Sequence, residues 1–351
     1  MIIHMNYTTK YASQIAERFH TGSITDAAAG HDYDFTGARS VRVYSVNTVE
    51  ETDYTRSGEN RFGTVHDLDT TLQEMMCTRA PAFSFTIDAL DNSDIAIDNA
   101  AGKALRRQLD EVTIPNMDRY RLKKWCQEAG TPFLMEKAPT AETIAMDIMD
   151  LSAAMTERGV PTEGRTLFLP TPYYKLLKLS DAVDSIEALG KDAIEKGVVG
   201  SFDGMKVVSV VTGYLPHGVY FMIKHKSSSV DPVKLAQYDV LEKVQGYSGP
   251  VAQGVTYYDA FVLGARNAGI GVAGSADFIL PAPQITVSGG KATIAAVSGA
   301  ESIRVTVDGS DPRCSMSAET YSAAITVAAG TTVRAVAVAD GKCGVEGSAK
   351  A

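Results

Sequence analysis

The sequence of 351 residues lacks the marks of a membrane or secreted protein. No apolar run approaches the roughly 18 residues that cross a bilayer. The N-terminus has no basic start, apolar core or small-residue cleavage site, so it predicts no signal peptide. The four cysteines are too widely spaced for a zinc site. We expect free thiols in a reducing compartment; the alternative is one bridge, between Cys314 and Cys343.

Clustered basic residues are also scarce, which argues against strong nonspecific binding to nucleic acid. The net charge is -9, and residues 281–351 hold six basic and six acidic side chains, so residues 1–280 carry all of it. The densest basic run, residues 119–125, fits a solvated helix face with Trp125 packed inward; a nucleic-acid patch is the alternative. The length suggests two or three domains.

No constellation of residues predicts catalysis. Gly269, Gly271 and Gly274 match a dinucleotide fingerprint, which requires a helix directly after it. The residues that follow cannot form a useful helix, so we expect a strand end and a hinge between domains. His31-Asp32 and His66-Asp67 are neighbouring pairs without a nucleophile motif, and we interpret them as solvated loop residues.

One group of carboxylates resembles a metal site only by number. The EF-hand pattern needs Gly at its sixth and Glu at its twelfth position, and no reading frame here provides both. We therefore expect no catalytic, cofactor-binding or metal-binding residues and no cofactor. We interpret the carboxylates in question as turn and helix-start residues, with a shell-stabilising cation as the alternative: Asp88, Asp91, Asp94 and Asp98.

The first part of the chain predicts projections rather than a core. Residues 1–36 look like an extended arm with one short helix at 11–19. Residues 39–46 alternate as a strand, and the polar stretch 47–71 predicts a long projecting hairpin. An isolated hairpin is marginally stable, so we expect it to dock on another subunit. Residues 83–87 alternate as a further strand.

Two helices with apolar stripes follow. The first is capped by Asn92 or Ser93, and Pro115 is expected to interrupt it. The second begins at Thr140, and Gly159 ends it. The stripe of the first comprises Ile97, Ala101, Ala104, Leu105, Gln108 and Val112; that of the second comprises Ile144, Ile148, Leu151 and Met155. Beyond them we expect a strand at 166–169, a short helix from Thr171 to Leu179, and strands at 205–211, 219–224, 238–244 and 255–263.

The composition changes at residues 274–283. Short Thr/Val/Ala strands follow at 284–287, 292–297, 302–307, 321–327 and 332–338, separated by Gly and Asp-Gly turns. This pattern is typical of a small β-sandwich. Its own strand set and zero formal charge predict a module that can be deleted without loss of assembly.

Taken in order, segments of residues 5–275 resemble the major capsid proteins of tailed bacteriophages, the Hong Kong 97 fold. Phe83-Ser-Phe-Thr-Ile-Asp-Ala-Leu-Asp91 is similar to the lead into that family's spine helix, and Pro115-Asn-Met-Asp-Arg-Tyr-Arg121 to its continuation. Tyr257-Tyr-Asp-Ala-Phe-Val-Leu263 looks like the closing strand. The loop lysine that cross-links subunits in the founding member is missing here, because residues 44–76 contain no Lys.

The resemblance implies an α+β chain of three parts. These are an N-terminal arm (1–36), a capsid core (37–280) with an extended loop at about 45–75 and with peripheral and axial domains, and a decoration domain (281–351). Residues 306–312 and 330–337 resemble the immunoglobulin-like module at the C-terminus of chitobiases, which implies a β-sandwich without catalysis and possible carbohydrate or host-surface contact.

The function that these resemblances imply is structural, not enzymatic. Copies would assemble into pentamers and hexamers of an icosahedral shell, with portal and scaffolding proteins as partners. The shell would form in the host bacterial cytoplasm and enclose double-stranded DNA without sequence-specific binding; an acidic wall would repel its contents and favour release. We predict inter-subunit contacts through the loop residues Glu50, Glu51, Arg56, Glu59 and Arg61. The alternatives are an encapsulin-type nanocompartment shell and, in another class, a carbohydrate-binding surface protein.

Overall fold

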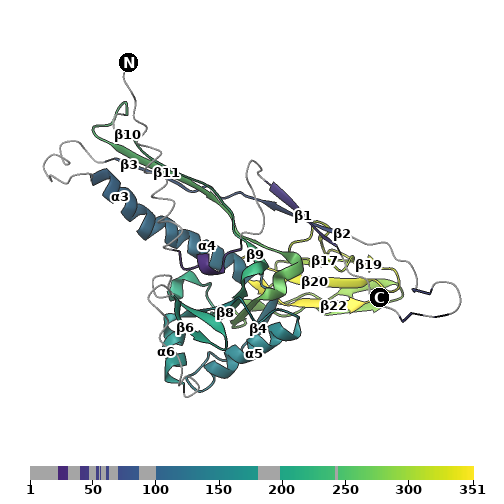
Figure 1. The fold of residues 1–351 in the computed structure, drawn as a ribbon. Coiled ribbons are helices and arrows are strands. Elements are labelled where there is room, and N and C mark those ends of the chain that lie inside the picture. Colours follow the sequence, from purple (N-terminus) through teal and green to yellow (C-terminus); the bar gives the residue numbers. More distant parts are fainter. Residues whose placement is uncertain are drawn as a thin grey trace.

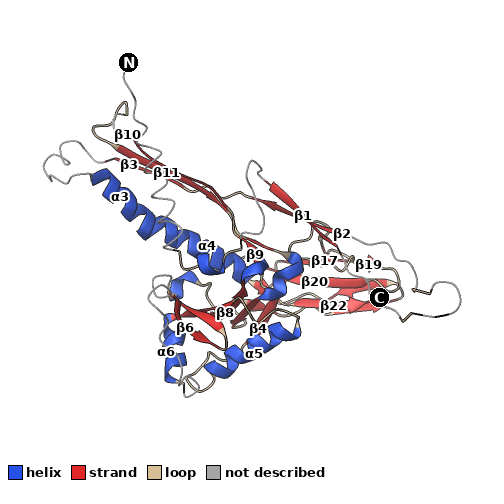
Figure 2. Cartoon of the chain, viewed as in Figure 1, coloured by secondary structure: helices blue, strands red, loops and turns tan. Residues whose placement is uncertain are grey.

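A computed structural model gives the fold as an elongated molecule in which a long helix lies beside several separate sheets (Figure 1). Figure 2 shows that helices cover the six-stranded sheet, whereas the C-terminal region is built of strands. The structure describes residues 23–30, 40–46, 53–54, 56, 61–62, 70–86, 100–180, 198–241 and 244–351. The expected arm helix at 11–19 lies outside them.

The long helix runs through Pro115 instead of ending there. It consists of α3 (Ala100–Gln108), the π-helical turn η2 (Leu109–Thr113) and α4 (Ile114–Gln127). Proline lacks an N–H and its ring clashes with the carbonyl four residues earlier, and the wider turn before Pro115 accommodates both. The predicted interruption is therefore wrong.

The same turn changes which residues of the long helix face the core. Leu105 and Leu109 are buried, whereas Val112, which belongs to the expected stripe, is 41% exposed. A constant helical period carried through a π turn assigns the wrong face beyond it. The predicted stripe is thus correct at Leu105 and wrong at Val112, while Ile97 and the side chain of Ala101 lie outside the described residues.

A three-stranded antiparallel sheet packs along α3. Its order is β10 (Val233–Leu241), β11 (Val251–Tyr258) and β3 (Ala82–Thr86). Phe83 and Tyr238 stack across the central strand with ring centroids 6.0 Å apart, and they pack with Leu105. A Cβ at Gly254, between them, would collide with both rings. Glycine at this position lets the two aromatic side chains meet.

A six-stranded mixed sheet forms the body, with apolar layers on both faces. Its order is β4 (Thr131–Leu134), β13 (Ile270–Gly274), β8 (Val219–His225), β5 (Arg165–Pro170), β7 (Met205–Val210) and β6 (Val198–Phe202). Helices α5 (Ile144–Glu157) and α6 (Thr171–Leu179) contribute to one layer. The predicted stripe Ile144, Ile148, Leu151 and Met155 is fully buried there.

Helix α4 contributes to the other layer. Trp125 is fully buried against Phe168, with ring centroids 6.0 Å apart, which confirms its inward orientation. The expected strand and helix boundaries around residues 166–179 are confirmed within a residue. The helix begins at Thr171, and Pro170 takes the N-cap position.

The glycines of the apparent dinucleotide fingerprint belong to packing, not to a hinge. Gly271 and Gly274 lie in the buried strand β13, and a turn follows, not a helix. A Cβ at Gly271 would lie 2.9 Å from Leu151 Cδ1 and from Met155 Sδ. Helix α5 therefore approaches this strand too closely for any side chain, and the expected interdomain hinge is wrong.

The C-terminal residues form the predicted β-sandwich. One sheet contains β15 (Ile285–Ser288), β16 (Lys291–Ile294) and β19 (Ile325–Thr326); the other contains β18 (Glu319–Thr320), β17 (Ser302–Thr306), β20 (Thr332–Val338) and β22 (Glu346–Lys350). Their shared core includes Ile303, Val305 and Val333. The sandwich is also joined to the body, because β14 (Ile279–Leu280) pairs in parallel with β21 (Cys343–Gly344).

The expected strand at 39–46 is confirmed, whereas most of the stretch 47–71 that was predicted as a hairpin lies outside the described residues. Strands β1 (Ser40–Val46) and β2 (Thr70–Met76) pair antiparallel from Ser40 with Met76 to Val46 with Thr70. Met75 and Cys77 are fully buried with Val230 and Leu263, so the hairpin base is anchored in the body.

Candidate functional site

The tip of the hairpin presents an exposed aromatic pair. Tyr54 and Phe62 lie with ring centroids 5.1 Å apart and are 53% and 86% exposed. The predicted contact residues Arg56 and Arg61 are exposed on the same segment, whereas Glu50, Glu51 and Glu59 lie outside the described residues. Large exposed aromatics near arginines are typical of interaction hot spots. The only sequence signal was two aromatic residues in a polar stretch.

A buried carboxylate connects the hairpin base to the long helix. Asp259 accepts hydrogen bonds from Thr78 N at 3.0 Å and from Tyr120 Oη at 2.6 Å. Burial, and next the hydrogen bond to Asp259, raises the pKa of Tyr120. This residue also explains an error in the expected strand at 255–263, which breaks at Asp259 into β11 and β12 (Phe261–Val262).

Arg79 adds a second connection at the same junction. Its guanidinium lies 4.5 Å from the ring centroid of Tyr120, and Nε donates to Tyr258 Oη at 3.1 Å. Planar guanidinium groups stack on aromatic faces in this way. The chain that leaves the hairpin is thus held to both α4 and β11.

Residues 23–30, which precede the hairpin, are clamped by α4. Asp118 accepts from Ser23 Oγ at 2.5 Å, from Ile24 N at 3.1 Å and from Thr25 Oγ1 at 2.6 Å. Its pKa is raised by burial, which those hydrogen bonds partly oppose. Arg121, one turn later and fully buried, donates to Thr25 Oγ1 at 3.2 Å. One face of one helix therefore fixes the end of the N-terminal arm.

A second set of buried polar groups completes the clamp. Lys224 is fully buried, donates to the carbonyl of Ala28, and lies 4.3 Å from the Trp125 ring centroid. Burial lowers the pKa of Lys224 to about 8. Asp231 accepts from Trp125 Nε1 at 2.9 Å and from Gly30 N at 3.2 Å. Lys224 and Asp231 both have hydrogen-bond partners, as is typical of buried polar groups that stabilise a fold.

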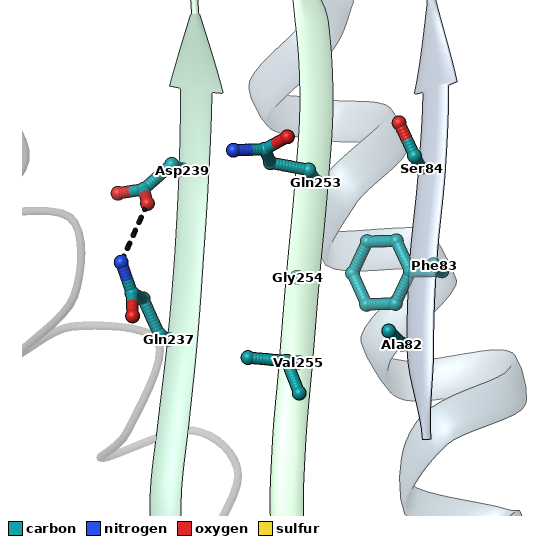
Figure 3. Close-up of a pocket in the computed structure, with 8 residues that line it drawn as sticks. All are labelled: Ala82, Phe83, Ser84, Gln237, Asp239, Gln253, Gly254 and Val255. Carbon is teal, nitrogen blue, oxygen red and sulfur yellow. Dashed lines mark hydrogen bonds between the residues drawn. The ribbon is translucent and has the colours of Figure 1, made fainter. Parts of the chain in front are cut away.

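The face of the three-stranded sheet that points away from α3 carries a shallow hollow (Figure 3). Its volume is about 540 Å³. Gln237 donates to Asp239 at 2.9 Å on one edge strand, and Ser84 lies on the other. Asp239 is the one ionisable residue among the lining residues, so the hollow offers polar contacts but no acid–base pair. The lining residues are Ala82, Phe83, Ser84, Gln237, Asp239, Gln253, Gly254 and Val255.

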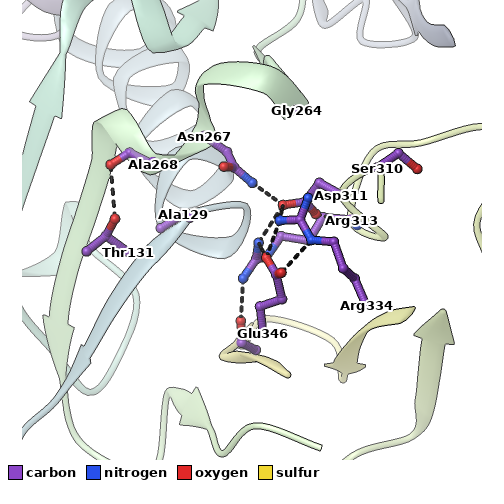
Figure 4. Close-up of polar contacts among 12 residues, drawn as sticks. Ala129, Thr131, Gly264, Asn267, Ala268, Ser310, Asp311, Arg313, Arg334 and Glu346 are labelled. Atoms are coloured by element: carbon purple, nitrogen blue, oxygen red, sulfur yellow. Dashed lines mark hydrogen bonds and ion pairs between the residues drawn. The ribbon is translucent and has the colours of Figure 1, made fainter. Parts of the chain in front are cut away.

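A buried ion-pair network joins the C-terminal sandwich to the body (Figure 4). Asp311 pairs with Arg313 at 2.8 Å and accepts a hydrogen bond from Asn267 of the body. Glu346 pairs with Arg334 at 2.5 Å. The nearby carboxylates, Asp311 first, oppose the effect of burial and raise the pKa of Arg313. Asp311 thus has one partner in the body and one in the sandwich, and such buried, hydrogen-bonded charges fix the position of the two parts relative to each other.

The cysteines take part in this junction as free thiols. Cys314 and Cys343 form no disulfide, so the alternative bridge is wrong and the predicted free thiols are confirmed. Cys343 is fully buried in the same cluster as Trp125, and its Sγ lies 3.6 Å from the carbonyl of Ala129. A residue of the C-terminal domain therefore completes the core of the body.

Two groups of sequence candidates cannot be placed. The neighbouring pairs His31-Asp32 and His66-Asp67, and the carboxylates of residues 88–98, lie outside the described residues. Within the described part of the chain, no three His, Cys, Asp or Glu side chains gather as metal ligands would. In that same part, no helix combines the length and the apolar character needed to cross a membrane.

Comparison with solved structures identifies this architecture. A chain of Mycobacterium phage Che8 is similar at a TM-score of 0.58 and 16% identity, covering 72% of this chain and 90% of that one. The mature capsid of bacteriophage PhiM1 is similar at 0.55 and 12%, covering 73% and 88%. The chain has the Hong Kong 97-type capsid fold.

Two further comparisons bear on this capsid-fold chain. A virus-like particle from Pyrococcus furiosus is similar at a TM-score of 0.50 and 12% identity, covering 77% of this chain and all of that one. Residues 293–346 match the Fn3 associated family, consistent with an immunoglobulin-like sandwich. No protein with a curated description matches the sequence.

Proposed function

We propose that this chain is the major capsid protein of a tailed bacteriophage, a structural subunit that self-assembles into an icosahedral shell. The observation that carries the proposal is the capsid fold, shared with phage structures that are covered over about nine-tenths of their length. The clamp and the anchored hairpin support it, because they hold residues 23–30 and the hairpin base at fixed places on the body.

The hairpin tip is the feature best suited to a contact between copies. An aromatic pair as exposed as Tyr54 and Phe62 gains most by entering a neighbour's surface, since burying an aromatic side chain contributes roughly 1.5–3 kcal/mol. When a surface of one copy binds a different surface of the next copy, the copies can close into a ring. Rings that join one another at an angle can then close a shell. We infer that Arg56 or Arg61 also pairs with a carboxylate of the neighbouring subunit.

The charge distribution suits a container for nucleic acid. Residues 1–280 carry the whole net charge of -9, which disfavours strong nonspecific binding of the body to DNA. The shell would enclose double-stranded DNA without reading its sequence, form in the host cytoplasm with portal and scaffolding proteins, and persist as the virion capsid. The C-terminal sandwich would face outward, where contact with carbohydrate or the host surface is open to it.

A nanocompartment shell of the encapsulin type is the second candidate. The similarity to the virus-like particle from Pyrococcus furiosus favours it, because that chain is covered in full. The two candidates differ in contents: a phage shell encloses DNA, whereas a nanocompartment encloses cargo protein. Nuclease-protected DNA in particles made with a scaffold and a portal would distinguish them.

The test of assembly is electron microscopy of the purified full chain, with light scattering for mass. We expect closed, uniform particles. Phe62→Ser should reduce their yield while the far-ultraviolet circular dichroism stays unchanged; Val112→Ser, on an exposed position of the long helix, is the matched control. A wild-type chain that stays monomeric at both low and high salt would contradict the proposal.

A further inference from the structure

The C-terminal sandwich touches the base of the hairpin through one loop. Residues 308–317, here called the brace loop, connect β17 to β18. The backbone N–H of Met316 in this loop donates to the carbonyl of Leu72 in β2 at 3.3 Å. The contact joins residues that are far apart in sequence, from the last domain of the chain to its first strand pair.

The brace loop also contacts the body next to the hairpin. Asp311 accepts a hydrogen bond from Asn267, which lies in the 3-10 helix η5 (Gly264–Gly269). At the start of η5, a Cβ added to Gly264 would lie 2.6 Å from the Sγ of Cys314. The loop is therefore packed against η5 so closely that one methyl group does not fit.

The third side of this arrangement is a bond between η5 and the hairpin. The side chain of Gln73 in β2 accepts from Gly264 N at 3.0 Å, and its Nε2 donates to the carbonyl of Val262 at 2.8 Å. The brace loop, η5 and β2 thus contact one another pairwise. Three mutual contacts restrict rotation of the hairpin base more than any single contact would.

The brace loop is itself held rigidly. Asp308 accepts hydrogen bonds from Ser310 N at 3.0 Å and from Ser317 Oγ at 2.5 Å, and the second bond joins the two ends of the loop. Asp311 accepts from Arg313 N at 2.8 Å, and its carbonyl accepts from Ser315 N at 3.0 Å. Short-range Asp and Ser bonds of this kind fix loop conformation. A loop of fixed conformation can hold the hairpin base at a fixed place relative to the sandwich, whereas a flexible loop cannot.

We infer that the brace loop positions the hairpin for assembly, so that the C-terminal sandwich is a working part of the shell subunit and not only an outward attachment. The surface formed by the brace loop and η5 sets the direction in which β1 and β2 leave the body. The link to assembly rests on the proposed shell function; the control of hairpin position does not.

The tight fit at Gly264 provides a test in which a second substitution should reverse the effect of the first. Gly264→Ala should push the brace loop away, whereas the double variant Gly264→Ala with Cys314→Ala removes the colliding sulfur and should restore the fit. Backbone strain is not expected, since Gly264 is not among the glycines with a positive φ. Tyr321→Phe, which loses a bond from Ile294 N inside the sandwich, is the matched control.

Hydrogen–deuterium exchange of the full chain measures the hairpin directly. Gly264→Ala should speed exchange in residues 72–76 roughly tenfold. Overpacking by one methyl group destabilises the local structure, which raises the equilibrium constant for local opening by about that factor. Residues 144–157 of α5 should exchange as in the wild type. The double variant and Tyr321→Phe should both exchange like the wild type in residues 72–76.

Particle yield then connects position to assembly. Gly264→Ala should form fewer or misshapen particles, and the double variant should recover them. Unchanged exchange in Gly264→Ala would overturn the inference, as would faster exchange that the double variant fails to reverse. If the wild type forms no particles, the proposed function fails, but the exchange data still decide whether the brace loop positions the hairpin.

Discussion

Removing residues 281–351 should destabilise the remaining body. Leu280 is 2% exposed and packs with Ala337 and Ala339 of the sandwich, so truncation exposes it to water. Truncation also removes Cys343, which fills a slot in the Trp125 cluster, and the backbone bonds from Cys343 N to Phe278 O at 3.0 Å and from Val345 N to Leu280 O at 2.9 Å. The composition alone predicted that the tail can be deleted without loss of assembly; these contacts predict a loss of stability in the body that remains.

The magnitude follows from what is exposed. Re-exposing one Leu costs roughly 1.5–3 kcal/mol, and an unfilled slot at Cys343 adds a comparable amount. A total of about 3–6 kcal/mol is a large part of the free energy of unfolding of a typical protein, about 5–15 kcal/mol. The melting temperature should fall by roughly 10 °C.

The assay is thermal unfolding of residues 1–280 beside the full chain, followed by circular dichroism and by fluorescence. Trp125 is the one tryptophan of the sequence, so its emission reports on the affected core alone. Leu280→Ala in the full chain should produce a smaller loss of the same kind. Equal melting temperatures and an unshifted emission spectrum for the truncated chain would refute the reasoning.

Three further predictions test the hairpin, the spine and the clamp. Arg56→Glu combined with Arg61→Glu should leave circular dichroism unchanged but lower particle yield; full yield at both low and high salt would dismiss an electrostatic contact. Leu105→Asp should lower the free energy of unfolding by roughly 3–5 kcal/mol, whereas Val112→Asp on the exposed side should change it little in the same denaturant titration. The pKa of Lys224 falls from 10.5 to about 8 on folding, so the unfolded chain binds more protons between these values and stability should rise with pH across that window. Lys224→Met should abolish that rise, and an identical pH profile for both proteins would contradict it.

Segments with a short repeat were predictable from the sequence. Ile144, Ile148, Leu151 and Met155 recur at three to four residues, and that spacing alone places them on one face of a helix. The strand at 165–170 and the helix after it follow from a short apolar run and a proline near the helix start. The order of such segments also carried the resemblance to capsid proteins, which the solved structures confirm at the level of the fold.

Local rules failed where a distant contact decided the outcome. Pro115 predicts a helix end by itself, yet the π turn before it and the packing of Leu109 let the helix continue. Gly271 reads as a fingerprint or a hinge until α5 is seen to press on it. In both cases the competing local preference amounts to a few kcal/mol, which tertiary packing exceeds.

The sequence by itself determined the helix at 144–157, the strand and helix at 165–179 and the composition break near residue 280, because these depend on neighbours within about ten residues. Only the tertiary structure decided what holds the projections in place. Asp118 meets Ser23 across 95 positions and Lys224 meets Ala28 across 196. The brace loop likewise reaches Leu72 from the far end of the chain. No spacing rule reaches so far, since such contacts arise only when folding brings buried polar groups together and each must find a partner.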